Sequence, residues 1–417
     1  MNEHIRSIAD NLQKEFGLDK YILKRNTIFS EKNFESETSY ILTLEWFPVE
    51  QAEEENEDFN PDGSAVVDID LHTGKLKQIV FVNGISHAQE GTLPNPDIEH
   101  VIEWVEEITG MMFGRQFKLT NETEREFSFH ATVDNIDVAP TGNIELAFNA
   151  NNQLTLFSID GIFPTEDEVE WEPFSLTKED VLDEIKGQLT LVDIPLEEQE
   201  KWLTIWQFNQ IFIRNDKSEV ILPETIYNLN NFKVLDVNLT WESANKYAFV
   251  PEKISLSTEI SYEDAMERVT VSPLSEEDVQ HCLNETKEFL RNIYSNDSGK
   301  WTVTGMYPEK GYIFVELSSD FFKAFRRKLK VIIRRQSYKV VNYWDNKLIL
   351  DMFQSFEESE EAQINKDDAF EKIKKYIDVT PVYVKDEPTN RYRLCGRIDC
   401  DVVINGVTGE IIAINDL

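Results

Sequence analysis

The segment from Asp58 to Gly63 has the residue spacing that comes closest to a metal site in this chain. It reads Asp58-Phe-Asn60-Pro-Asp62-Gly63 and matches the first half of a calcium loop, in which alternate side-chain oxygens converge on the ion and Gly allows a sharp turn. The Glu expected at the twelfth position is missing, because Ile69 stands there. Asn-Pro-Asp-Gly is also an ordinary turn sequence. We therefore favour a solvated loop, and calcium-dependent binding at Asp58, Asn60 and Asp62 stays an alternative.

A second candidate is a basic cluster between residues 323 and 339 that contains no acidic residue. Its members are Lys323, Arg326, Arg327, Lys328, Lys330, Arg334, Arg335 and Lys339. Such a cluster can bind phosphate or nucleic acid. The whole chain, however, has 78 acidic and 41 basic residues and a net charge of −37, so nucleic acid and anionic membranes are poor partners. We interpret the cluster as a solvated strand face, or as a face that pairs with acidic loops of the same chain.

The other candidate residues form no catalytic motif. The sequence has no Gly-x-Ser-x-Gly, no phosphate-binding loop and no dinucleotide-binding glycine motif, and its histidines lack the spacing of metal ligands. The histidines are His4, His72, His87, His100, His130 and His281. We expect His72 to be solvated in a turn and His130 to be half-buried in a strand. We therefore predict no catalytic, cofactor-binding or metal-ligating residue.

The three cysteines are Cys282, Cys395 and Cys400. Cys395 and Cys400 lie five residues apart on an expected strand, so they point to opposite faces and cannot easily share a metal. So few cysteines fit a reducing compartment, and we interpret all three as small buried apolar residues.

The elements that position these residues are organised around a short hairpin that occurs at 66–79 and again at 401–414. Both segments have two alternating apolar runs on either side of a turn, where Gly supplies a positive φ. The matching pairs are Ile69 and Ile404, Asp70 and Asn405, Thr73 and Thr408, Gly74 and Gly409, Leu76 and Ile411, and Ile79 and Ile414. The spacing from Ile69 to Leu76 occurs again from Ile213 to Val220 and from Ile333 to Val340. The sequence therefore predicts a repeated structural unit.

Each hairpin follows a helix and two strands in the expected order of elements. Apolar residues at spacings of three and four predict helices at 3–16, 98–108, 276–293 and 365–377, with another from 175 to Leu189. Residues 202–213 are rich in Trp, Ile and Phe and are expected to be strand. This order indicates an α+β fold made of tandem repeats of a helix packed on an antiparallel β-sheet. We expect two units in 1–173, a divergent third in 174–272 and two more in 273–417.

The last unit resembles a PepSY unit. The resemblance rests on Asn365-Lys-Asp-Asp-Ala-Phe, Tyr392-Arg-Leu and the closing hairpin Val402-Val-Ile-Asn-Gly-Val-Thr-Gly-Glu-Ile. The larger layout, with Val237-Asn-Leu-Thr-Trp and Ile260-Ser-Tyr-Glu-Asp-Ala, is similar to the YcdB/YcdC repeat proteins of bacilli. The resemblance implies a non-catalytic module that binds and restrains a partner. It transfers no functional residue, because Thr73, Gly74, Thr408 and Gly409 shape turns.

The expected function is therefore a non-enzymatic, cytosolic protein-interaction or regulatory module whose open sheet faces bind a protein partner. The chain shows no secretory signal and no apolar run of membrane-spanning length, so we expect a cytoplasmic protein that binds neither membranes nor nucleic acid and uses no cofactor. One alternative is a hydrolase-type enzyme with an acidic site in a cleft between units. Another alternative is the calcium-dependent binding protein described above.

Overall fold

The computed structural model describes residues 2–32, 38–51, 59–226, 232–243, 248–254, 259–268, 272–322, 325–386 and 389–417. The chain divides into two compact units. Unit 1 comprises Met1–Phe174, Thr258–Val269 and Pro381–Cys395, and unit 2 comprises Ser175–Ser257, Thr270–Thr380 and Gly396–Leu417. The segment 174–272, expected as one unit, therefore contributes to both. Helices and mainly antiparallel sheets are combined, which confirms the α+β class.

Unit 1 begins with a helix and an antiparallel ribbon of four strands, all expected from the sequence. These are α1 (Glu3–Glu15), β1 (Tyr21–Lys32), β2 (Thr38–Pro48), β3 (Ala65–Asp70) and β4 (Leu76–Phe81). A second helix and set of strands follow: α2 (Ile98–Thr109), β5 (Phe117–Glu122), β6 (Glu126–Val133), β7 (Ile136–Ala139), β8 (Asn143–Phe148) and β9 (Leu154–Asp160). Because β4 pairs with β9, both sets form one continuous sheet.

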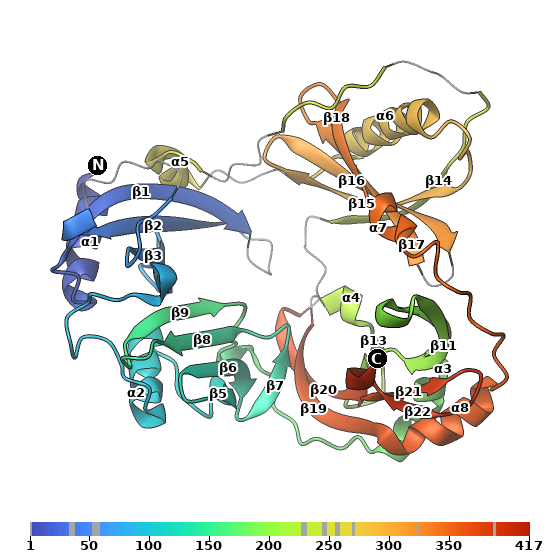
Figure 1. Ribbon diagram of the computed structural model, residues 1–417, viewed down its shortest axis with the longest axis horizontal. Coiled ribbons are helices and arrows are strands. Elements are labelled where there is room, and N and C mark those ends of the chain that lie inside the picture. Colours follow the sequence, from blue (N-terminus) through green and yellow to red (C-terminus); the bar gives the residue numbers. More distant parts are fainter. Residues whose placement is uncertain are drawn as a thin grey trace. The chain divides into compact units, whose positions relative to one another are not determined.

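The core of unit 1 lies where the apolar stripes of α1 and α2 meet one face of this sheet. Ile5 and Leu12 of α1 and Val101 of α2 belong to the same buried cluster as Leu44 and Trp46 of β2. Figure 1 shows α1 beside the curved ribbon of β1, β2 and β3. Successive strand residues point to opposite sides of a sheet, so the alternate residues of β2 are left on the face away from the core.

Two parts of unit 1 come from distant positions in the sequence. The first is α5 (Tyr262–Glu267), which buries Ala265 in the unit 1 core. Just before this helix, the Ile260 amide donates a hydrogen bond to the Ile28 carbonyl. The second comprises residues of β19 (Ile377–Asp386) and β20 (Arg391–Cys400). Val382 to Val384 of β19 pair in parallel with β7. No local pattern in the sequence predicts that either segment packs in unit 1.

Unit 2 contains a four-stranded sheet in the order β10-β11-β21-β22. Its strands are β10 (Leu189–Leu196), β11 (Lys201–Phe208), β21 (Val402–Asn405) and β22 (Ile411–Ala413). The same unit holds α3 (Leu182–Gln188), α4 (Pro223–Ile226) and α8 (Lys366–Ile373), together with β12 (Ile211–Arg214) and β13 (Val220–Ile221), which belong to a different sheet. The strand structure expected over 202–213 is present as two strands, β11 and β12. Leu189, expected in the helix, starts β10 instead, because its backbone is already extended.

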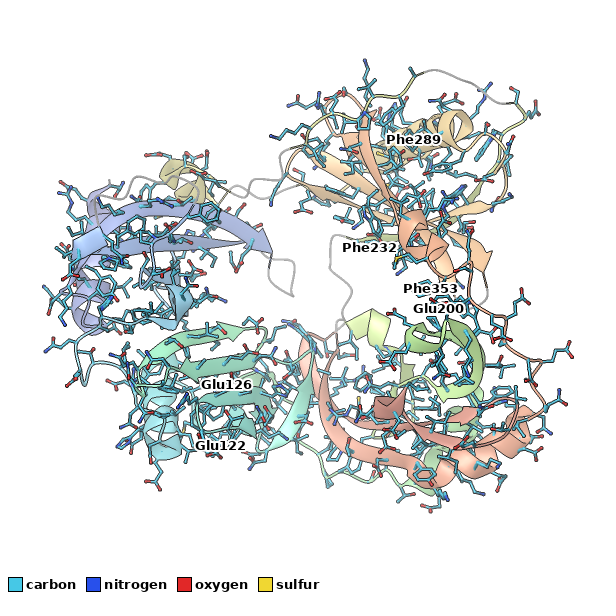
Figure 2. The ribbon with its side chains drawn as sticks, in the orientation of Figure 1. Glu122, Glu126, Glu200, Phe232, Phe289 and Phe353 are labelled. Carbon is cyan, nitrogen blue, oxygen red and sulfur yellow. The ribbon has the colours of Figure 1, made fainter. Side chains whose placement is uncertain are left out.

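Unit 2 also contains a five-stranded antiparallel sheet in the order β14-β15-β16-β17-β18. The strands are β14 (Lys233–Leu239), β15 (Trp301–Glu309), β16 (Tyr312–Phe322), β17 (Phe325–Arg334) and β18 (Lys339–Asp345). In the chain, α6 (Glu276–Ile293) lies between β14 and β15, and α7 (Lys347–Asp351) follows β18. One face packs on α6 through Val279, Phe289 and Leu290. Phe289 lies on the α6 side of the sheet and Phe232 on the other side (Figure 2). Within the described ranges, no helix has the length and apolar character that a membrane span requires.

The turn between β3 and β4 is closed by Asp70 and Gly74. The Gly74 amide donates to the Asp70 carbonyl at 2.8 Å, and Gly74 has φ +69°. The Asp70 Oδ1 accepts from the amides of His72 and Thr73 at 3.1 and 2.7 Å, and the Thr73 Oγ1 accepts from the Lys75 amide at 3.4 Å. The side chain of Asp70 thus satisfies amides that the turn leaves without a ladder partner.

The turn between β21 and β22 repeats these bonds. The Gly409 amide, at φ +72°, donates to the Asn405 carbonyl at 2.9 Å. The Asn405 Oδ1 accepts from Val407 and Thr408, and the Thr408 Oγ1 accepts from Glu410. The predicted matches of Asp70 with Asn405, Thr73 with Thr408 and Gly74 with Gly409 are therefore present as matching hydrogen bonds. The match of Ile79 with Ile414 was wrong, because Ile79 is buried in β4 whereas Ile414 is 49% exposed and begins a short 3-10 helix.

The turns of the other two hairpins with this spacing resemble the Asp70–Gly74 turn less closely. Tyr338 occupies the position of Gly74, with φ +51°, and its amide donates to the Arg334 carbonyl at 2.9 Å. In the hairpin from Ile213 to Val220 the positive φ lies at Lys217 instead, and the Lys217 amide donates to the Arg214 carbonyl. That turn is therefore of a different type.

Candidate interaction surfaces

The expected calcium loop is described only in part, because Asp58 lies outside the described residues. The oxygens of its other two members are engaged by side chains. The Asn60 Oδ1 accepts from the Arg25 Nη1 at 3.1 Å, and the Asp62 Oδ1 accepts from the Asn83 Nδ2 at 2.6 Å. Across the described ranges, no group of three or more His, Cys, Asp or Glu residues could hold a metal ion. The described part of this segment is a hydrogen-bonded turn.

The basic cluster is divided between the two faces of the five-stranded sheet. Arg327 points to the α6 side, where its guanidinium donates to Asp345 at 3.1 and 2.5 Å and lies over the Tyr294 ring at 4.9 Å. Burial acts to raise the pKa of Asp345, but hydrogen bonds from Arg327 and Tyr294 hold that pKa below its usual value. On the other face, the Lys330 Nζ lies 3.0 Å from Glu316.

Two further members of the basic cluster pair with acids outside β17. Arg334 lies 2.6 Å from Glu252, and Arg335 lies 3.7 Å from Asp278. Arg327, Lys330, Arg334 and Arg335 therefore pair with acids of the same chain. The prediction named acidic loops, but Glu316 and Asp345 lie in strands and Asp278 lies in α6. Arg326 and Lys328 are exposed on β17, and Lys323 lies outside the described residues.

Two of the histidine expectations were wrong. His130 is exposed, because the alternation of β6 turns Phe129 into the core and His130 away from it. His72 is half-buried in the hairpin turn, with its ring 5.3 Å from the ring of Tyr40. Neither histidine therefore has the surroundings expected for it.

The cysteines are all free, and Cys282 and Cys395 are buried, whereas Cys400 is partly exposed. Burial raises the pKa of the Cys282 thiol to about 12. Because the thiolate is the nucleophilic form, Cys282 is unreactive at neutral pH.

A shallow pocket of about 390 Å³ lies over β10 and β11. Asp193 lines it together with Glu360 and Glu361. The Asp193 Oδ1 already accepts from the hydroxyls of Thr204 and Ser359, at 2.5 and 3.0 Å. These bonds fix the Asp193 carboxylate against the segment that precedes α8.

A larger groove of about 500 Å³ lies on the face of the five-stranded sheet opposite α6. Its floor is a row of polar residues that face one another across the strands, because Asn238 pairs with Thr302 and Thr302 pairs with Ser318. Asp236, Gly299, Lys300, Thr304, Ser319 and Arg326 complete the lining. We call this set of residues the sheet groove.

The next part of the same sheet face is aromatic. The Tyr307 and Phe314 rings stack at 5.1 Å, and the Lys330 Nζ lies over them. Trp344 is opposite Lys330 in the register of β17 and β18, and its side chain is 51% exposed. The face opposite α6 thus combines a polar groove with an exposed indole.

Three exposed apolar side chains lie close together on and just after α7. Leu348, Ile349 and Met352 are 82%, 54% and 68% exposed, whereas Leu350 is buried. We call these three exposed residues the α7 surface. None of these residues was predicted as a site, although an apolar run shortly before the acidic segment 357–361 could have indicated them. Clustered exposed apolar residues mark interaction sites.

Comparison with known proteins gives little further information. Neither a known protein family nor a curated protein matches the chain. Among solved structures, the chain is similar to the YpeB C-terminal domain of Bacillus megaterium, with 11% sequence identity over 53% of this chain and 96% of that domain. The TM-score of 0.27 makes this a weak likeness, which carries no argument about fold or function.

Proposed function

We propose that this chain is a non-enzymatic protein-interaction module that binds a protein partner through the α7 surface. The observation that carries the proposal is the exposure of Leu348, Ile349 and Met352 within five residues of a strongly acidic chain. Fully burying one such side chain contributes about 1.5–3 kcal/mol. Three neighbouring side chains of this kind are sufficient for the central contact of an interface.

The partner suited to this surface has an apolar pocket with a basic rim. The pocket would take up the three side chains, and the basic rim follows from the net charge of −37. Opposite charge steers association and raises its rate, whereas like charge suppresses it. The same charge disfavours nucleic acid as the partner.

We further propose that the chain is built from duplicated PepSY-like helix-on-sheet units. The support is the matching set of hydrogen bonds in the turns at Asp70–Lys75 and Asn405–Glu410. Two further observations agree with it: α1 is followed by the antiparallel strands β1–β4, and α6 is followed by the antiparallel strands β15–β18.

The protein-interaction proposal is tested by affinity capture with matched variants. Leu348→Asp and Met352→Lys each place a charge in the α7 surface without touching a buried side chain. Val49→Asp is the control, because Val49 is also 53% exposed but lies in unit 1. We expect the wild type and the control to retain the same partner, and the two α7 variants to bind it at least about tenfold more weakly.

The decisive readout is the dissociation constant of the purified partner. Equal constants for all four proteins would remove the α7 surface as the binding site. Circular dichroism of the variants separates loss of binding from loss of folding.

A further inference from the structure

We propose that the sheet groove is a binding site for a neutral oligosaccharide. The groove lies on the face of β14–β18 opposite α6 and has a volume of about 500 Å³, which is in the range of small-molecule sites. It is a different surface from the α7 surface, so the proposal does not depend on a protein partner.

The first support is the hydrogen-bonding capacity of the lining. Among the described residues, no hydrogen bond joins the hydroxyls of Thr302 and Ser318 to a protein partner, and Asp236 and Arg326 have no ion pair. Hydroxyls both donate and accept, a carboxylate accepts and a guanidinium donates. The lining therefore offers donors and acceptors in alternation, as a ligand rich in hydroxyl groups requires.

The second support is the charge balance of the lining. Asp236 offsets Arg326, and Lys300 is already paired with Asp297 at 2.9 Å. A groove for an anionic ligand needs surplus positive charge, and the net charge of −37 would repel such a ligand further. A lining without surplus charge and with few apolar side chains favours a neutral polar ligand.

The third support is Trp344 on the same sheet face. Trp344 is opposite Lys330 and Ser318 is opposite Lys328, so the two lie two strands apart across the sheet and two residues apart along it, which corresponds to about 12 Å. Lys328 and the salt-bridged pair of Lys330 and Glu316 occupy the surface between them. An exposed indole provides an apolar platform with a polar edge, on which the flat apolar face of a sugar ring can lie. A ligand that reaches both Trp344 and Ser318 must be extended, which favours an oligosaccharide over a single sugar.

The test is isothermal titration calorimetry of the full chain with maltohexaose, cellohexaose and chitohexaose. We expect one of the three to bind with a dissociation constant on the order of 1 mM or tighter. Trp344→Ala, and separately Thr302→Val, should weaken that binding by about tenfold. Trp171→Ala is the matched control, since Trp171 is 52% exposed and lies in unit 1, and it should leave the affinity unchanged.

Three results would overturn the proposal. The first is no heat of binding with any of the three oligosaccharides at millimolar concentration. The second is binding that both groove variants leave intact, and the third is tighter binding of the anionic polygalacturonate than of every neutral sugar. Loss of the protein partner in the α7 variants has no bearing on these results, because those variants keep the sheet groove.

Discussion

Asp70 and Asn405 differ in charge but close their turns with the same side-chain oxygen. Each Oδ1 accepts two backbone amides, and in each turn a glycine follows four residues later with a positive φ. The requirement at this position is an acceptor of the right length, which both side chains supply. The similarity of the two segments was therefore predictable from residue type and spacing alone.

The two glycines give a matched prediction about stability. A Cβ at position 74 would meet no atom within 4 Å, so Gly74→Ala adds only the cost of a left-handed backbone, about 1–2 kcal/mol. A Cβ at position 409 would lie 3.0 Å from Ile364 and 3.2 Å from the Lys372 Nζ. We expect Gly409→Ala to lower the free energy of unfolding by more than Gly74→Ala does, as measured by urea denaturation. A smaller loss for Gly409→Ala would show that its surroundings are not packed as described.

Asp68 gives a prediction about pH. Burial raises the pKa of Asp68 and the charge of Glu45 raises it further, while the hydrogen bond from Thr43 lowers it. Because the folded state then holds the proton more tightly than the unfolded chain, the ionised carboxylate lowers stability above the folded pKa. Asp68→Asn should be more stable than the wild type near pH ~7, and the difference should vanish below the ordinary value of 3.8. An advantage for Asp68→Asn that stays constant across this range in thermal melts would refute the assignment.

At the scale of elements, helices and hairpins with a local signal were predictable. The helix α6 has a capping box, an apolar stripe and a polar outer face, and each of these is readable in the sequence. The pairing of β7 with β19 was not predictable, because Asp137 and Val382 are brought together only by the tertiary fold.

The candidate surfaces were less predictable than the elements. Leu348 and Leu350 are identical residues two positions apart, yet one is exposed and the other buried. A short apolar run in the sequence is equally compatible with buried and with exposed side chains. The sheet groove depends on the register of β14, β15 and β16, which the sequence does not reveal. Binding through open sheet faces therefore stays a prediction, and the sequence did not indicate which residues would line such a face.

The capping box of α6 gives a prediction for this scale. The Ser275 Oγ accepts from the Asp278 amide at 3.1 Å, and Ser275→Ala should cost about 1 kcal/mol of unfolding free energy. The Asp278 carboxylate accepts hydrogen bonds from the Ser275 amide and from the Tyr338 hydroxyl. Asp278→Ala should therefore lower the free energy of unfolding by more than Ser275→Ala does. Asp278→Asn, which keeps an acceptor, should lie between the two in chemical denaturation. Equal losses for Ser275→Ala and Asp278→Ala would mean that the bond from Tyr338 contributes nothing.

At the scale of the whole molecule, the dominant property is the net charge of −37. Exposed charges act over about 8–10 Å at physiological ionic strength, so this charge affects how fast a partner approaches more than how tightly it is held. Arg326 and Lys328, which have no ion pair within the described ranges, are local exceptions on one strand.

This property predicts a salt dependence of partner binding. Raising sodium chloride from about 0.05 to about 0.3 M should slow association with a basic-rimmed partner, because the attraction is screened. The dissociation rate should change little with salt and should rise in Leu348→Asp. Surface plasmon resonance separates the two rates, and an association rate that does not depend on salt would exclude a basic rim.

The most direct test is photo-crosslinking from position 348 in the full chain. A benzoylphenylalanine at position 348 replaces an exposed apolar side chain with another, and the same residue at position 171 serves as the control. We expect a single recurrent protein adduct from position 348, absent from position 171 and lost when Met352→Lys is added. Identical adduct patterns from both positions, or none from position 348, would contradict the assignment of the α7 surface as a partner-binding site.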